Sequence, residues 1–159
     1  MSKISTEQKE NVMIVKSTFD APRDLVFEVH SECKHLTNWY GGKEWQLSKC
    51  EMDFRVGGRW SYCFKIPDED ACGLATYKEI SKPEKIVYKD HFLDEQGNIS
   101  SELPSSLITL EFTEENGKTT IVNRWEYPTE KDLNMMLEMG AIEGLTDIWD
   151  RLHAYLNQL

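Results

Sequence analysis

The longest helical pattern in the chain lies at its C-terminal end, from Thr129 to Leu159. Apolar residues recur there every three or four positions, which places them in one stripe along a helix. These residues are Leu133, Leu137, Ala141, Leu145, Ile148, Leu152 and Leu156. Thr129 followed by Asp132 resembles a capping box, which is typical of a helix start. We expect a kink or break near Gly140, because glycine destabilises a helix interior.

Most of the remaining chain alternates between apolar and polar residues or is rich in β-branched residues, and both patterns predict strands. Seven strands are expected, at residues 12–19, 45–53, 60–64, 74–80, 85–92, 106–113 and 119–127. Two short helices are expected after the first strand, one ending near His30 and one around residues 33–38. Asn116-Gly117 indicates a tight hairpin between the last two strands.

A glycine pair, Gly57-Gly58, separates two alternating apolar segments. Opposed residues of a hairpin share a face, so the loop must have an odd length to join both segments into one apolar face. A three-residue loop would pair Phe54 with Trp60 and Met52 with Tyr62. One glycine of the loop would then adopt the left-handed conformation at a bulge.

This order of elements predicts an α+β fold of the helix-grip type. A seven-stranded antiparallel sheet would curl around the long C-terminal helix, because hairpin-length links make strands antiparallel. We expect residues 1–11 to form a flexible N-terminal tail and residues 12–159 to form a single domain. The space between sheet and helix would be either a packed core or a pocket.

Composition and charge exclude several classes of protein. The 159 residues carry a net charge of −10, so no nucleic-acid partner is expected, because phosphate binding needs clustered Lys and Arg. No apolar run is long enough to span a membrane, and the N-terminus lacks a signal-like apolar segment, which favours a cytoplasmic protein without a membrane partner. The four cysteines form no C-x-x-C pair and are therefore expected to be free thiols.

Large aromatic side chains are the main candidates for a site. Many of them fall on predicted inward positions, which favours a cavity for an apolar or aromatic ligand over a filled core. His91 could face this cavity and act as an acid or base, although a structural histidine is the simpler interpretation. The candidate ligand-binding residues are Trp39, Trp45, Met52, Phe54, Trp60, Tyr62, Phe64, Tyr77, His91, Trp125, Met136, Gly140 and Trp149.

No metal site, cofactor or catalytic residue is expected. His30 and His35 lie about 140° apart around a helix, so with Cys33 they do not converge on one ion. No nucleophile constellation, phosphate-binding loop or cofactor fingerprint is present in the sequence. We therefore lean against an enzyme.

Several motifs resemble the family of activators of the heat-shock-protein-90 ATPase, within the START-like, birch-pollen-allergen-like (SRPBCC) superfamily. They are Phe19-x-Ala21-Pro22, Trp39-Tyr40-Gly41, Cys50-Glu51-Met52-Asp53-Phe54-Arg55-Val56-Gly57-Gly58-Arg59-Trp60, Tyr77-Lys78-Glu79-Ile80, Pro83-Glu84-Lys85-Ile86-Val87-Tyr88 and the Gly144-Leu145 to Asp150-Arg151-Leu152 close. The resemblance implies a START-like domain. Leu145 stands where the family has tryptophan and Trp149 where it has leucine, so we expect a reshaped pocket.

Three functions are compatible with the sequence. The first is binding of a small apolar or aromatic molecule in an internal cavity, which would be closed and dry. The second is a co-chaperone-like module that stimulates a chaperone ATPase, which requires an exposed apolar patch. The third is a polyketide-cyclase-like enzyme, which requires an ionisable group with a shifted pKa in the cavity. Either a monomer or a homodimer fits the sequence.

Overall fold

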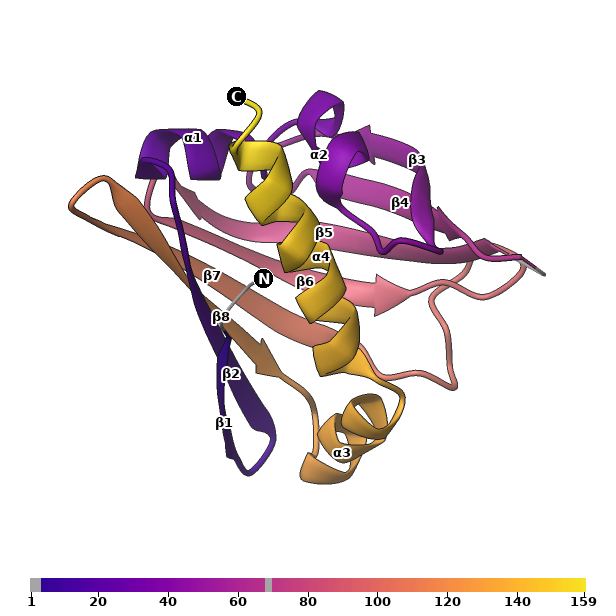
Figure 1. The fold of residues 1–159 in the computed structure, drawn as a ribbon. Helices are drawn as coiled ribbons and strands as arrows, with labels where there is room; N and C mark the ends of the chain where they lie inside the picture. Colours follow the sequence, from indigo (N-terminus) through magenta and orange to yellow (C-terminus); the bar gives the residue numbers. More distant parts are fainter. Residues whose placement is uncertain (1–3, 68–69) are drawn as a thin grey trace.

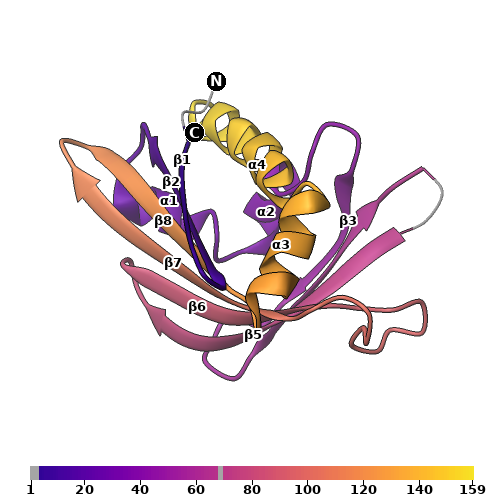
Figure 2. The ribbon, with the colours of Figure 1, turned by 90° about the horizontal axis from the view of Figure 1, so that it is seen from below.

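The computed structural model describes residues 4–67 and 70–159, and shows one antiparallel sheet curled around a long helix (Figures 1 and 2). The strands are β1 Ser5–Lys9, β2 Val12–Phe19, β3 Gln46–Met52, β4 Arg59–Lys65, β5 Asp70–Ser81, β6 Lys85–Phe92, β7 Ser106–Glu115 and β8 Lys118–Glu126. The helices are α1 Arg23–Glu28, α2 Cys33–Trp39, α3 Glu130–Glu138 and α4 Ala141–Leu156. The predicted α+β helix-grip fold is confirmed.

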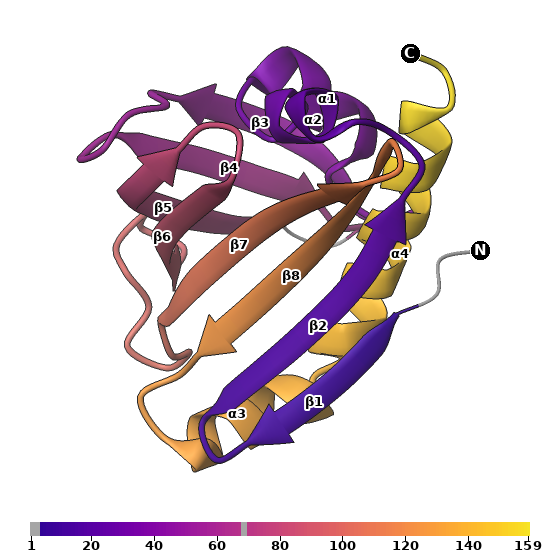
Figure 3. The same ribbon diagram turned by 90° about the vertical axis from the view of Figure 1, so that its left-hand side faces the viewer.

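The sheet has eight strands in the order β1-β2-β8-β7-β6-β5-β4-β3, one more than predicted. The additional strand, β1, pairs with β2 at the edge of the sheet (Figure 3). It falls within the stretch expected to be a flexible tail, of which residues 1–3 lie outside the described part of the chain. All five residues of β1 are exposed, so this strand has no inward apolar positions and its sequence lacks the alternation that marks the others.

The C-terminal helical pattern is interrupted at Gly140, as predicted. Gly140 has a left-handed φ of +94° and separates α3 from α4. The Thr129 side chain accepts a hydrogen bond from the backbone N–H of Asp132 at 3.0 Å, so the predicted N-cap is also present. The break lets α3 lie beside β2 at the bottom of the molecule in Figure 1, while α4 crosses the concave face of the sheet (Figure 2).

The glycine hairpin has the predicted faces but a different register. Met52 pairs with Trp60, and Cys50 pairs with Tyr62, so the register is shifted by two residues from the predicted one. The loop is longer because the backbone turns back on itself before β4, with the Gly58 N–H donating to the carbonyl of Arg55 at 2.8 Å. A shift of two residues keeps every side chain on its face, so the apolar pattern alone could not detect it.

The expectation of free thiols is wrong in this structure. Cys33 of α2 is bonded to Cys50 of β3, and Cys63 of β4 to Cys72 of β5. Cys63 and Cys72 are directly opposed in the sheet, whereas the other pair links a helix to the edge strand. Both pairs lie far enough apart in sequence that only the folded topology brings them together. The first disulfide fixes the start of α2 against the sheet.

The core lies between the concave face of the sheet and the helices. Phe19, Phe112 and Ile121 from the strands and Leu152 from α4 are almost completely buried. The aromatic ring of Phe19 packs edge-on against Trp149, with ring centroids 5.4 Å apart. None of the described helices is both long and apolar enough to cross a membrane. One region of this interface is not filled, and it forms the candidate site.

Candidate functional site

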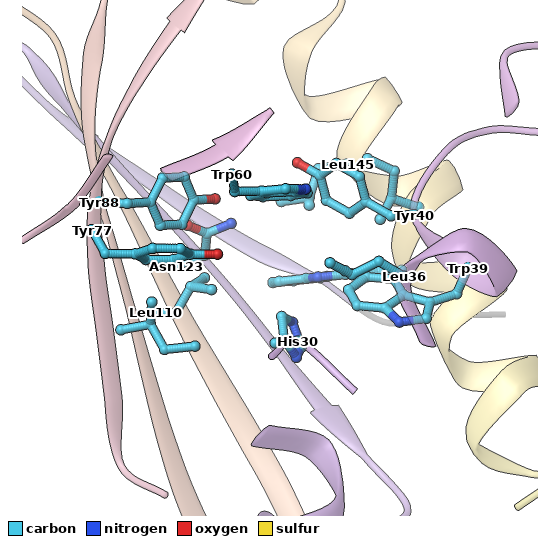
Figure 4. Close-up of a pocket in the computed structure, with 13 residues that line it drawn as sticks. His30, Leu36, Trp39, Tyr40, Trp60, Tyr77, Tyr88, Leu110, Asn123 and Leu145 are labelled. Atoms are coloured by element: carbon cyan, nitrogen blue, oxygen red, sulfur yellow. The ribbon is translucent and has the colours of Figure 1, made fainter. Parts of the chain in front are cut away.

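A small cavity lies between the middle of the sheet and α4. Its volume is about 50 Å³, which is enough for a few water molecules. The wall is made mostly of aromatic and branched apolar side chains (Figure 4). The lining residues are His30, Leu36, Trp39, Tyr40, Trp60, Tyr77, Ile86, Tyr88, Leu110, Asn123, Leu145, Ile148 and Trp149.

The sheet side of the cavity follows from strand register. Ile86, Leu110 and Asn123 are cross-strand neighbours on β6, β7 and β8, so they form one row on the concave face. Tyr77 and Tyr88 are opposed on β5 and β6 and form the adjacent row. The helix α4 closes the other side with Leu145, Ile148 and Trp149. Leu145 and Trp149, the two positions at which the sequence predicts a reshaped pocket, both line the cavity.

Two buried polar atoms in the cavity wall have no hydrogen-bond partner among the described residues. They are the indole Nε1 of Trp60, a donor, and the Oδ1 of Asn123, an acceptor. Asn123 is flanked across the sheet by Leu110 and Val15, which offer no polar side-chain group. Leaving such groups unpaired costs about 1–3 kcal/mol each, so they mark a place where a ligand or water would bind favourably.

Tyrosine hydroxyls add further polar groups to the cavity. The hydroxyls of Tyr77 and Tyr88 point toward the space between Trp60, Tyr40 and His30 (Figure 4). Burial raises the pKa values of Tyr40, Tyr77 and Tyr88 well above the ordinary value of tyrosine, so all three hydroxyls stay protonated at neutral pH. Each can therefore donate a hydrogen bond to a ligand as well as accept one.

His30 supplies the imidazole of the cavity wall. Its Nδ1 lies 2.7 Å from the carbonyl oxygen of Val26, and because a carbonyl only accepts, Nδ1 carries the proton. Burial lowers the pKa of His30 to about 4, so the ring is neutral at physiological pH. Its Nε2 is then an acceptor. The ring packs edge-on against Trp39, with centroids 4.8 Å apart.

Asp90 lies next to the cavity on the same face of β6 as Tyr88, although it does not line it. The Tyr62 hydroxyl donates a hydrogen bond to the Asp90 carboxylate at 2.8 Å. Gly73 makes this contact possible, because a Cβ there would come within 2.4 Å of the Tyr62 ring. Asp90 keeps partial surface exposure, yet the protein atoms packed around it raise its pKa from 3.8 to about 7 through burial. The hydrogen bond from Tyr62 opposes this shift only in part.

The structure brings four of the predicted site residues together in the cavity wall, namely Trp39, Trp60, Tyr77 and Trp149. Tyr62, Phe64, Trp45, Phe54, Met52, Trp125 and Met136 pack in the surrounding core without lining the cavity. Gly140 is the junction of α3 and α4. His91 lies on the opposite face of β6 from Tyr88, where its Nδ1 is hydrogen-bonded to the Ser105 hydroxyl, so it does not face the cavity.

Sequence reasoning missed His30, Tyr40, Tyr88, Asn123 and the neighbouring Asp90. Asn123 and Asp90 did carry a signal, since each is a polar residue at an inward position of an otherwise apolar strand. His30 and Tyr40 have no strand alternation to mark them, because they lie outside the strands, in the segment that runs from α1 through α2 to β3. Their place in the cavity depends on how that segment folds back over the sheet.

A curled antiparallel sheet that grips a long helix, with a cavity between them, defines a protein of the START-like helix-grip class. The family model described as "Activator of Hsp90 ATPase homolog 1-like protein" matches residues 20–157, and the chain belongs to this family. Among curated proteins, no sequence matches the chain.

Solved structures from three bacteria are similar over nearly the whole chain. A Mycobacterium smegmatis protein is 25% identical with a TM-score of 0.87, over 97% of this chain and 95% of that one. A Staphylococcus epidermidis protein is 29% identical with a TM-score of 0.84, over 97% and 94%. An Arthrobacter aurescens protein is 24% identical with a TM-score of 0.90, over 98% and 92%, which supports the fold alone.

Proposed function

We propose that the protein binds a small, neutral, aromatic molecule in the cavity between the sheet and α4. The observation that carries this proposal is the unpaired donor of Trp60 and the unpaired acceptor of Asn123 in a wall of aromatic rings. A ligand with one acceptor and one donor would satisfy both atoms, and its ring would pack among the aromatic side chains. Membership of a START-like family is consistent with ligand binding.

The cavity favours an uncharged ligand. The lining contains no Asp, Glu, Lys or Arg, and its one imidazole is neutral because burial lowers the His30 pKa to about 4. A charged group brought into such surroundings without an opposite charge loses far more hydration energy than it regains. The Asp90 carboxyl nearby would further disfavour an anion whenever it is ionised.

The ligand must also be small or must enlarge the cavity. Drug-sized ligands occupy pockets of about 300–1,000 Å³, far more than the space present here. The wall formed by Leu145, Ile148 and Trp149 belongs to α4, whose N-terminal end is joined to α3 through Gly140. We infer that a bound ring displaces this wall outward, since the sheet side is fixed by its hydrogen-bonded strands.

The alternatives receive less support. Among the described residues, the exposed large apolar side chains each belong to a different connecting or terminal segment, which does not favour the single patch expected of a co-chaperone-like module. They are Val56, Ile66, Ile99, Met139 and Leu159. An acid–base enzyme could use Asp90, whose pKa is about 7, but Asp90 does not line the cavity. The cytoplasmic location stays a prediction, and the two disulfides are more typical of oxidising compartments.

A thermal-shift comparison of benzamide and benzoate tests the proposal. These compounds are nearly isosteric, but benzamide is neutral with one donor group and one acceptor, whereas benzoate is an anion. Benzamide should raise the melting temperature and benzoate should not. In Trp60→Phe, which removes the donor, benzamide affinity should fall about tenfold, the loss expected for one hydrogen bond. Trp45→Phe is the matched control outside the cavity and should bind like the wild type.

A panel of neutral aromatic compounds that gives no shift, or an equal response to benzamide and benzoate, would contradict the proposal. So would an identical loss of affinity in Trp60→Phe and Trp45→Phe, because that result would indicate a general effect of tryptophan loss.

A further inference from the structure

Three metal-ligating side chains converge outside the cavity, where α1 is joined to α2. Glu28 is the last residue of α1, Glu32 is the N-cap of α2, and His35 lies in the first turn of α2. One ligand atom from each lies within 4.8 Å of the other two. His35 Nε2 is 3.2 Å from Glu28 Oε2 and 3.6 Å from Glu32 Oε2.

His35 is held in a fixed orientation by the helix α4. Its Nδ1 lies 2.7 Å from the hydroxyl of Tyr155, and its side chain is only 12% exposed. In the structure Nε2 lies 3.2 Å from the Glu28 carboxylate, which only accepts, so Nε2 carries a proton. Loss of that proton, with Nδ1–H donating to the Tyr155 hydroxyl, would direct the Nε2 lone pair at an ion held between the two carboxylates. Histidines that bind metals usually donate their second ring N–H to such a partner, which fixes the tautomer. The arrangement therefore resembles a ligand with its supporting hydrogen bond.

The distances also fit a metal centre. Ligand atoms at about 2.1 Å from a zinc ion, in tetrahedral geometry, lie about 3.4 Å from one another. The two separations measured from His35 Nε2 lie on either side of this value. The side chains of Glu28 and Glu32 are 52% and 44% exposed, so both can rotate. The third separation, between their two carboxylates, can therefore shorten around an ion.

We propose that Glu28, Glu32 and His35 bind one divalent transition-metal ion such as Zn²⁺, with water in the remaining coordination position. Imidazole and carboxylate ligands suit such ions. The sequence argued against a metal because His30 and Cys33 do not converge with His35, and the structure agrees on those two. The Nδ1 of His30 is engaged by the carbonyl of Val26, and Cys33 is in a disulfide. The ligands that complete the set are instead the two carboxylates.

Without the ion, the three side chains form an ion pair when His35 is protonated. Lys34 Nζ lies 3.8 Å from Glu32 Oε1, the oxygen that does not face His35. A metal ion would replace the proton on His35, because only the neutral imidazole is a ligand. Binding of the ion and protonation of Nε2 therefore exclude each other.

Calorimetric titration of the full chain with ZnCl₂ tests the proposal. The chain is treated with a chelator first, and a thiol assay confirms that both disulfides are intact, so that no free thiolate binds the metal. One Zn²⁺ should bind per chain with micromolar affinity. His35→Gln, Glu28→Gln and Glu32→Gln should each weaken binding at least tenfold. Tyr155→Phe should weaken it about tenfold, as loss of a supporting hydrogen bond does.

His91→Gln and Glu102→Gln are the matched controls and should bind Zn²⁺ like the wild type. The proposal is overturned if no saturable binding occurs below millimolar Zn²⁺, or if His35→Gln binds as tightly as the wild type. Should His35→Gln fail to fold, the exposed Glu28→Gln and Glu32→Gln variants decide the outcome, and unchanged affinity in both would reject the site.

Discussion

Asn123 is a buried polar side chain in an apolar row of the sheet. Its Oδ1 has no partner among the described residues, and its cross-strand neighbours are Leu110 and Val15. A protein selected for stability alone would place an apolar residue at this position. We interpret Asn123 as a group kept for binding, and this interpretation has a measurable consequence.

Asn123→Leu should stabilise the ligand-free protein by about 1 kcal/mol, because it removes an unpaired buried acceptor while keeping the branched shape of the side chain beside an unfilled cavity. The same change should weaken benzamide binding. Urea unfolding gives the first quantity and a ligand titration the second. Asn11→Leu is the matched control, since the Asn11 amide donates to the carbonyl of Tyr127 at 2.7 Å and its loss should destabilise the protein. A destabilised Asn123→Leu with normal ligand affinity would refute the interpretation.

Asp90 should make stability fall as the pH rises. Its pKa is raised by burial from 3.8 to about 7, so between these values the folded protein retains a proton that the unfolded chain has released. The free energy of unfolding of the wild type should therefore decrease relative to Asp90→Asn as the pH rises from about 4 to above 7. The lowered pKa of His30 makes stability rise with pH, which is the opposite trend. His30 is present in both proteins, so the difference between them reports on Asp90 alone.

Urea unfolding at a series of pH values measures this difference. The exposed Asp147→Asn is the control and should track the wild type at every pH. A constant difference between wild type and Asp90→Asn across the series would show that Asp90 titrates normally.

Sequence patterns could identify inward positions but not the pairing of polar groups. The alternation of β8 places Asn123 inward with Ile121 and Trp125, and the structure agrees. Whether an inward polar side chain finds a partner depends on the neighbouring strands. For this reason the sequence marks Asn123 and Asp90 as unusual inward polar residues. It does not show that Asp90 is hydrogen-bonded to Tyr62 whereas the Oδ1 of Asn123 has no partner among the described residues.

At the scale of elements, the junction of α3 and α4 depends on glycine for its backbone conformation. Gly140→Ala should destabilise the protein by about 1–2 kcal/mol, because a residue with a Cβ is strained at the left-handed φ of +94°. Steric crowding adds nothing, since the Cβ would make only an ordinary contact with the Glu143 carboxylate at 3.8 Å. Gly144→Ala is the matched change inside α4, where a Cβ makes ordinary contacts with the Trp45 ring at 3.8 Å and 3.9 Å. It should stabilise the protein by up to about 1 kcal/mol.

Thermal or urea unfolding of both variants checks the prediction. The two changes in the free energy of unfolding need not be equal in size, but Gly140→Ala must be the less stable variant. The reverse order would mean that the left-handed junction is not the conformation in solution.

Elements with a strong pattern were the most predictable. β6 has the predicted bounds, and the Gly140 break and the Thr129 cap were read from single residues. The glycine hairpin was predicted with the correct faces, because alternation fixes the face, but with a register two residues off, because alternation repeats every two residues. The disulfides were missed because they depend on spatial proximity between α2 and β3 and between β4 and β5.

At the scale of the whole molecule, the order of strands and helices was enough to predict the helix-grip fold. The position of the cavity was not predictable, since it depends on which side chains fill the space between the sheet and α4. Trp125 and Met136 fill the space at other points of this interface, whereas Leu145 and Trp149 lie at the cavity itself. The fold therefore supplies the site, and these individual side chains set its size and polarity.

The most direct test of ligand binding is the indole N–H signal of Trp60 in ¹H–¹⁵N NMR spectra during titration with benzamide. The signals of the five tryptophans are assigned by single Trp→Phe substitutions. The Trp60 signal should move with saturation, the Trp45 signal should stay in place, and benzoate should move neither. If the Trp60 signal does not move while surface signals shift, or if benzoate acts like benzamide, the cavity is not a site for a neutral aromatic ligand.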